Sequence, residues 1–144
     1  MEDVLVRAAV VVAILGAAGA FGWWWSRRSG AVREDGDGRF ADHELAAVGL
    51  DGGGPEVRAL LLGSPTCAPC RSVKDVLAEV EAERDGFRWV SVDAAEHLPI
   101  TREHHVLRVP TLFVIDREGR ILARTSGVPA TRELLRVVDR DHTG

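Results

Sequence analysis

The stretch GSPTCAPCRSV, residues 63–73, contains both cysteines of this 144-residue chain, Cys67 and Cys70. It follows an apolar run over residues 57–62 and precedes a segment whose apolar residues recur at helical spacing. Two residues three positions apart on a helix lie on one face, with their Cβ atoms about 5 to 6 Å apart. A modest adjustment brings two sulfur atoms at that spacing into a disulfide. The spacing therefore predicts a dithiol that opens and closes reversibly.

Apolar patterns on either side of this motif predict one α/β domain. The nearly continuous apolar run over residues 57–62 fits a strand that is buried on both faces. After the motif, apolar residues recur from Val73 to Val80 and predict an amphipathic helix that ends near Arg84. The other predicted elements are a short helix with Asp42 as its N-cap, a strand over residues 87–93, a brief helix over 98–106, a strand over 112–115, its hairpin partner over 120–125 and a last helix around 134–138.

Composition excludes several classes of function. The formal net charge is −4, and no basic stripe is interleaved with aromatic residues, which argues against nucleic-acid binding. Two cysteines in a C-x-x-C motif do not form the disulfide framework of a small secreted domain. Redox chemistry and metal binding remain.

The N-terminal segment predicts a transmembrane helix over residues 4–25. Residues 8–25 carry no charge and as a helix would extend about 27 Å, close to the thickness of a bilayer core. Three tryptophans, residues 23–25, end the run at the level where amphipathic rings prefer to lie, and Arg27 and Arg28 follow. The alternative is a cleaved signal peptide, since Ala18-Gly19-Ala20 has small-x-small spacing. Acidic residues at the front of the chain and the length of the run favour an anchor.

Residues 26–38 are charged and rich in glycine, which predicts a flexible tether before a domain over residues 39–144. Basic residues near the span are more numerous after it than before it. Arg7 precedes it, whereas Arg27, Arg28, Arg33 and Arg39 follow it. The positive-inside rule then places the domain in the cytoplasm, with an extracytoplasmic domain as the alternative.

The order of elements resembles the thioredoxin family over roughly residues 39–141. The residues that carry the resemblance are the C-x-x-C pair, Val109-Pro110-Thr111 before a β-hairpin, with Pro110 forty positions after Cys70, and Gly127 behind the hairpin. The resemblance implies an α/β, thioredoxin-like three-layer fold, in which a central mixed sheet is flanked by helices. It also implies a cis peptide bond between Val109 and Pro110 and a thiol-disulfide oxidoreductase without a cofactor or metal.

The position of Cys67 just ahead of a helix predicts its chemistry. Unpaired N–H groups and the positive end of the helix dipole favour a thiolate there and lower its pKa, so Cys67 is the predicted nucleophile. Cys70, one turn further in, is the predicted resolving cysteine. The resemblance also implies which residues contact a substrate: Thr66, Ala68, Pro69, Val109, Pro110 and Gly127.

The chain departs from the family pattern near the resolving cysteine. Thioredoxins usually place a buried acid six positions before the first cysteine, and here that position is Leu61. The family's lysine partner for that acid aligns with Trp89, so both halves of a buried ion pair are apolar, an exchange that often preserves stability. We therefore expect Cys70 to lose its proton to water or substrate in a slower resolving step. Thr66 replaces the family's tryptophan, so the client range should differ.

The sequence leaves three alternative functions open, and the proposed activity also implies partners. A zinc site would combine Cys67 and Cys70 with nitrogens from His97, His104 or His105. A redox-inactive adaptor would use the fold for binding only, and an extracytoplasmic oxidase or cytochrome-maturation reductant would use the same cysteines on the other side of the membrane. The expected partners are a disulfide-containing client protein and an electron donor, either a thioredoxin-reductase-type flavoprotein or a membrane relay.

Overall fold

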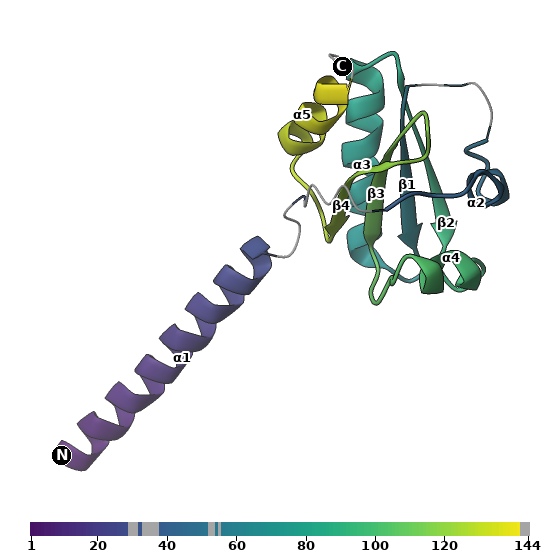
Figure 1. The fold of residues 1–144 in the computed structure, drawn as a ribbon. Helices are drawn as coiled ribbons and strands as arrows, with labels where there is room; N and C mark the ends of the chain where they lie inside the picture. The colour runs from purple at the N-terminus through teal and green to yellow at the C-terminus, as the bar shows by residue number, and fades with distance from the viewer. Residues whose placement is uncertain (29–31, 33–37, 52–53, 55, 142–144) are drawn as a thin grey trace.

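The computed structural model describes residues 1–28, 32, 38–51, 54 and 56–141 (Figure 1). Its elements run in the order α1 (Glu2–Arg28), α2 (Asp42–Ala47), β1 (Val57–Gly63), α3 (Ala68–Glu83), β2 (Phe87–Asp93), α4 (Leu98–Glu103), β3 (Thr111–Asp116), β4 (Ile121–Ser126) and α5 (Thr131–Asp141).

The strands form one mixed sheet in the order β2-β1-β3-β4. β1 runs parallel to β2, with Val57 opposite Phe87, and antiparallel to β3, with Leu62 opposite Thr111. β3 and β4 form an antiparallel hairpin. Every residue of β1 is buried, as a continuous apolar run in an inner strand requires. The predicted mixed central sheet is confirmed.

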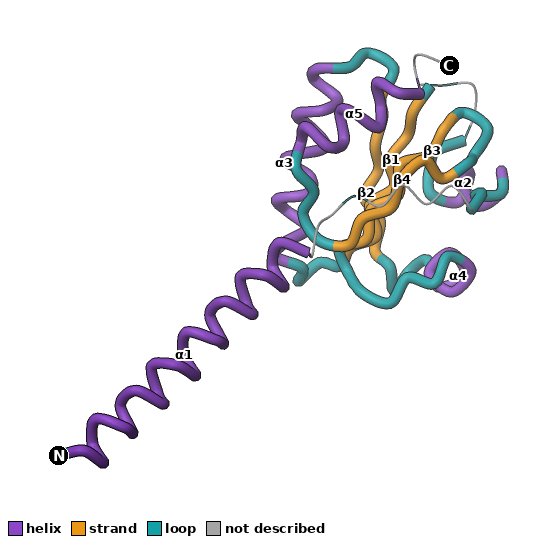
Figure 2. The backbone as a smooth tube through the Cα atoms, turned by 60° about the vertical axis from the view of Figure 1, so that its left-hand side comes forward, coloured by secondary structure: helices purple, strands orange, loops and turns teal. Residues whose placement is uncertain are grey.

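Helices cover both faces of this sheet, α3 and α5 on one face and α2 and α4 on the other (Figures 1 and 2). Successive side chains of a strand point to opposite faces, so β1 supplies both cores. Ala59 and Leu61 join the cluster under α3 and α5, whereas Leu60 and Leu62 join the cluster under α2 and α4. The three-layer thioredoxin-like arrangement is therefore confirmed.

Several predicted boundaries differ from the structure. Asp42 is the first residue of α2 and not its N-cap; Ala41 is the N-cap, and its N–H donates to the Glu44 carboxylate at 2.8 Å. The helix predicted over residues 98–106 ends at Glu103, because His104 leaves helical geometry and His105 has a φ of 48°. The hairpin partner predicted over residues 120–125 is Ile121–Ser126, and the strand predicted over 112–115 is one residue longer at each end.

The N-terminal helix α1 contains a span, Asp3–Trp25, that is long and apolar enough to cross a membrane, and none of that span is buried against the rest of the protein. A signal sequence near an N-terminus can meet the same criterion of length and composition. Most of the predicted tether lies outside the described residues. Of its later part, Val32 packs against the core cluster under α3 and α5, and the carbonyl of Gly38 accepts a hydrogen bond from Ile121 at 2.9 Å.

Candidate active site

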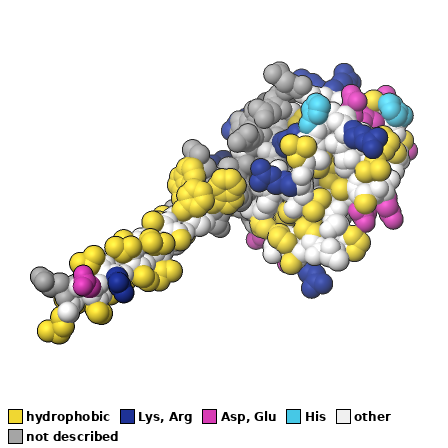
Figure 3. Space-filling view, turned by 90° about the horizontal axis from the view of Figure 1, so that it is seen from below, with side chains coloured by type: hydrophobic (Ala, Val, Ile, Leu, Met, Phe, Trp, Pro, Cys, Tyr) yellow, Lys and Arg dark blue, Asp and Glu magenta, His cyan; other side chains and the backbone are white. Residues whose placement is uncertain are grey.

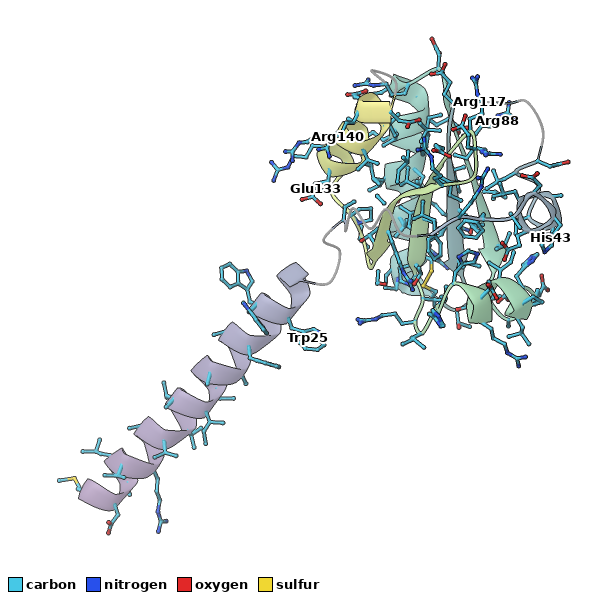
Figure 4. All side chains as sticks on the ribbon, viewed as in Figure 1. Trp25, His43, Arg88, Arg117, Glu133 and Arg140 are labelled. Atoms are coloured by element: carbon cyan, nitrogen blue, oxygen red, sulfur yellow. A yellow bond between two sulfur atoms is a disulfide. The ribbon has the colours of Figure 1, made fainter. Side chains whose placement is uncertain are left out.

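A disulfide joins Cys67 and Cys70, whose Cα atoms are 5.4 Å apart, and Figure 4 shows it as a yellow bond near one end of the sheet. Cys67 is the N-cap of α3, and Pro69 lies in the first helical turn. Proline suits that turn because its fixed φ fits the helix and its missing N–H would have no helical partner. The motif thus folds as the sequence predicts, with one sulfur at the helix entrance and the other one turn inside.

The two cysteines differ in exposure. Cys70 is only 4% exposed, whereas Cys67 is half-buried and its neighbours Thr66 and Ala68 are exposed. The first turn of α3 carries no acidic residue that would oppose a thiolate. After reduction, the Cys67 sulfur would lie at the helix N-terminus, where unpaired N–H groups and the helix dipole favour a thiolate.

The other predicted site residues lie at the same edge of the sheet. β1 ends where β3 begins and β4 ends, since Leu62 is opposite Thr111 and Thr111 is opposite Ser126. The Val109–Pro110 bond is cis, as the family resemblance implied, and the Gly127 N–H donates to the Pro110 carbonyl at 3.1 Å. This register brings Val109, Pro110 and Gly127 to the edge that carries the cysteine motif.

The interior beneath Cys70 is apolar. Leu61 is fully buried in the cluster that includes Val73, one turn after Cys70, and Trp89 packs against the same cluster. Leu61 and Trp89, which stand where the family has an ion pair, thus pack as ordinary core residues. Leu61 offers no group that could accept the Cys70 proton.

Four exposed apolar side chains, which we call the apolar rim, belong to segments at this same edge. They are Leu98 (48% exposed), Leu107 (93%), Val109 (38%) and Val128 (39%), and they include every large apolar side chain described after residue 38 that is exposed. Leu98 follows the end of β2, Leu107 and Val109 precede β3, and Val128 follows the end of β4. Figure 3, which views this edge, shows hydrophobic side chains interspersed with Lys and Arg. Exposed apolar side chains at one end of a sheet make this end a candidate interaction surface.

The histidines considered as zinc ligands have other roles. His97 is the N-cap of α4 and His104 is its C-cap. The His104 ring stacks on Phe40 with 3.7 Å between ring centroids, and its Nε2 lies 3.2 Å from the Glu44 carboxylate. Within the described part of the chain, no group of three or more His, Cys, Asp or Glu side chains is placed to hold a metal ion.

Sequence reasoning missed three features of the site. Gly63 lies directly against Cys70, and a glycine that closes a buried strand is the signal that could have indicated this close approach. Leu107 and Val128 are exposed beside the motif, but apolar residues in short connections do not reveal their exposure. Arg124 donates to the carbonyls of His104 and His105 at 3.0 and 2.9 Å, a contact between distant elements that no local pattern encodes.

Comparisons with known proteins agree with this geometry. No family model matches the chain. A thioredoxin from Listeria monocytogenes is 31% identical over 75 residues, which covers 51% of this chain and 72% of the relative. A thioredoxin from Bacillus subtilis is 27% identical over 78 residues, which covers 54% of this chain and 74% of the relative. The structure of a chloroplastic thioredoxin z shares the fold, with a TM-score of 0.58 and 18% identity over 73% of this chain and 93% of that one.

Proposed function

The chain belongs to the thioredoxin family and is a thiol-disulfide oxidoreductase, and from that premise we propose that it reduces disulfides of client proteins at a membrane surface. The observation that carries the proposal is the asymmetric disulfide at the entrance of α3, which joins an accessible Cys67 to a buried Cys70. Cys67 is the nucleophile and Cys70 the resolving cysteine.

The reaction has two exchange steps. In the first, the Cys67 thiolate attacks one sulfur of the client disulfide; a bond forms between Cys67 and the client, and the other client sulfur leaves as a thiolate that takes a proton from water. In the second, Cys70 loses its proton and attacks the Cys67 sulfur. This step forms the Cys67–Cys70 disulfide and releases the second client sulfur, so the client gains two electrons. An electron donor, either a flavoprotein reductase or a membrane relay, then returns the protein to its dithiol form.

The apolar rim supports a protein client. A small disulfide needs only the sulfur of Cys67, whereas a protein segment can cover Leu107, Val109 and Val128 while its cystine reaches the site. The partly exposed Val109 precedes a buried Pro110, so its backbone lies at the surface beside the site. We assign substrate contact to Thr66, Ala68, Pro69, Val109, Pro110 and Gly127, with Val109 and Pro110 facing the client backbone.

The N-terminal helix supports attachment to a membrane. Its span Asp3–Trp25 has a mean hydropathy of 2.3 and contributes nothing to the described core of the domain. The arginines after the span, Arg27 and Arg28 first among them, favour the cytoplasmic side for the domain, where a reductase is the expected activity.

The test is reduction of insulin disulfides by the full chain in detergent, with dithiothreitol as the electron donor. We expect the wild-type chain to accelerate precipitation of the insulin B chain and Cys67→Ser to abolish the acceleration. Cys70→Ser should accumulate a mixed disulfide with the client that reductant releases, because the second exchange cannot occur. The matched control is the double variant of both cysteines, which should trap nothing. Full activity of Cys67→Ser would reject the proposal.

A further inference from the structure

We propose that Gly63 is a positioning residue that favours the disulfide form of the Cys67–Cys70 couple, because its missing side chain leaves the space that the Cys70 sulfur occupies. The inference rests on the proposed function, since it concerns the same redox couple. It adds a determinant of the reduction potential that lies outside the C-x-x-C motif.

The contact between Gly63 and Cys70 is close. A Cβ placed on Gly63 would lie 3.0 Å from the Cys70 Sγ and 3.6 Å from the Cys70 Cβ. The first distance is shorter than an ordinary carbon–sulfur contact, whereas the second is ordinary. A methyl group at residue 63 would therefore press on the sulfur atom and on little else. The Gly63 φ is not in the left-handed region, so substitution by alanine brings no backbone strain of that kind.

The backbone on both sides of this contact cannot easily withdraw. Gly63 is the last residue of β1; it pairs with Asp93, and its carbonyl accepts a hydrogen bond from the Ala94 N–H at 2.9 Å. On the Cys70 side of the contact, Val73 and Leu77 hold α3 in place, because both are fully buried in the core. Close-packed interiors transmit strain instead of absorbing it. The Cys70 side chain must therefore accommodate an added methyl group.

The two redox states differ in how far Cys70 can adjust. In the disulfide, its sulfur is bonded to Cys67, which is itself placed by its N-cap position and by a hydrogen bond from its N–H to the Ser64 carbonyl at 3.2 Å. In the dithiol, the Cys70 side chain is free to turn about χ1 to another staggered position. A methyl group at residue 63 should thus destabilise the oxidised state more than the reduced state and shift the potential to less negative values.

The experiment measures the exchange equilibrium of the full chain in detergent with dithiothreitol. Oxidised protein and reduced dithiothreitol give the protein dithiol and cyclic oxidised dithiothreitol, so two electrons and two protons pass from reagent to protein. For Gly63→Ala we expect this equilibrium to shift threefold to tenfold toward the protein dithiol, which corresponds to about 14 to 30 mV. Thermal unfolding of the oxidised and reduced forms is recorded in parallel.

The matched control is Gly63→Ala in a Cys70→Ala background. There the sulfur is gone, and the nearest remaining atom is the Cβ at the ordinary distance of 3.6 Å. We expect a lower Tm for Gly63→Ala in the oxidised wild-type background, and little change in the reduced form or in the Cys70→Ala background. Equal losses in all three backgrounds, or an unchanged exchange equilibrium, would overturn the inference and leave the proposed function intact. If wild-type Cys67 and Cys70 do not equilibrate with dithiothreitol at all, the proposed function fails first and the inference fails with it.

Discussion

A redox site of this kind needs packing that stabilises the disulfide and a group that accepts the proton of the resolving cysteine. The residues around Cys70 provide the first and not the second. Leu61 and Trp89 meet the first need, since both pack in or against the cluster under α3. They do not meet the second, because neither side chain can accept a proton at physiological pH. We therefore expect the resolving step to depend on water or on the client for proton transfer, at a residue that is only 4% exposed.

Replacing Leu61 by aspartate should restore an internal proton acceptor at a cost in stability. Burial raises the pKa of the new carboxyl above its value in the unfolded chain, so the folded state favours the protonated form. We expect the free energy of unfolding at pH 7 to fall by about 2 to 5 kcal/mol. The loss should be smaller near pH 4, where the carboxyl is protonated in the folded state and about half protonated in the unfolded chain. The measurement is chemical denaturation at both pH values.

The same variant should change the pH dependence of the resolving step. Stopped-flow kinetics of the second exchange would show a new titration in Leu61→Asp, with Leu61→Asn as the matched control that cannot titrate. Identical rates and pH profiles in wild type, Leu61→Asp and Leu61→Asn would contradict the view that the missing acid limits this step.

Leu107 provides a test of the apolar rim. Its side chain is 93% exposed, so Leu107→Ser should change the free energy of unfolding by less than about 0.5 kcal/mol. Loss of apolar contact with a protein client should raise KM for insulin several-fold, with kcat nearly unchanged. The matched control is Ala82→Ser, an exposed position near the far end of α3. An unaltered KM in Leu107→Ser would remove this residue from the client surface.

At the scale of elements, Arg124 links β4 to the end of α4. Its guanidinium donates to the His104 and His105 carbonyls, at the point where His105 has a φ of 48°, and lies 5.0 Å from the centroid of the Phe113 ring. The chain continues from there through Leu107 to Val109 and Pro110. One arginine in the hairpin therefore holds the start of the segment that leads to Val109 and Pro110, to which we assign client contact.

Arg124→Met should loosen that segment. The two carbonyls lose a charged donor, so we expect the free energy of unfolding to fall by about 1 to 2 kcal/mol and KM for insulin to rise. Arg124→Lys should recover only part of the loss, because an ammonium group cannot span two carbonyls as the planar fork does. Thermal denaturation and insulin kinetics provide both measurements, and Arg102→Met, an exposed arginine on α4 itself, is the control. Full rescue by lysine would show that charge alone is sufficient.

Local patterns predicted most elements and the cysteine geometry because both depend on short-range periodicity. β2 appears where the apolar spacing placed it, and Cys67 lies just ahead of α3 as expected. The misplaced cap of α2 has a different cause, since the Glu44 carboxylate reaches back to the Ala41 N–H and so favours an earlier start. The contact of Gly63 with Cys70 depends on how α3 packs against the end of β1, and the contacts of Arg124 join residues about twenty positions apart in the chain. The cis Val109–Pro110 bond was predicted only through the family resemblance.

At the scale of the whole molecule, α1 and the domain are built on different principles. The described core is drawn from residues after position 38, with Val32 packed against one of its two clusters, whereas the side chains described in α1 are exposed along its length. A helix that is apolar on all sides and unburied requires a nonpolar environment other than its own domain. The proposed membrane span provides that environment.

Charges placed in the middle of α1 should release the protein from membranes. Substituting both Ile14 and Leu15 by arginine costs about 5 to 7 kcal/mol on insertion scales. We expect the wild-type chain to remain in the membrane pellet after alkaline extraction and the double variant to move to the supernatant. A wild-type chain found in soluble form with its N-terminal segment removed would instead identify a cleaved signal.

A phosphatase reporter fused after Gly144 tests on which side of the membrane the domain lies. Activity only outside the membrane would reverse the cytoplasmic assignment.

Because Val32 packs against the core, the distance between the end of α1 and the domain is limited. Only four peptide units separate the last residue of α1 from Val32, and they can extend at most about 14 Å. With α1 in a bilayer, the edge of the sheet that carries Cys67 and Cys70 would stay close to the membrane surface. It would reach only a layer within about one domain diameter of the lipid headgroups. Cystines within that layer would meet the enzyme at a raised local concentration, whereas those further from the membrane or in bulk solution would not. The distance of a client's cystine from the bilayer would then contribute to client selection alongside the client's sequence.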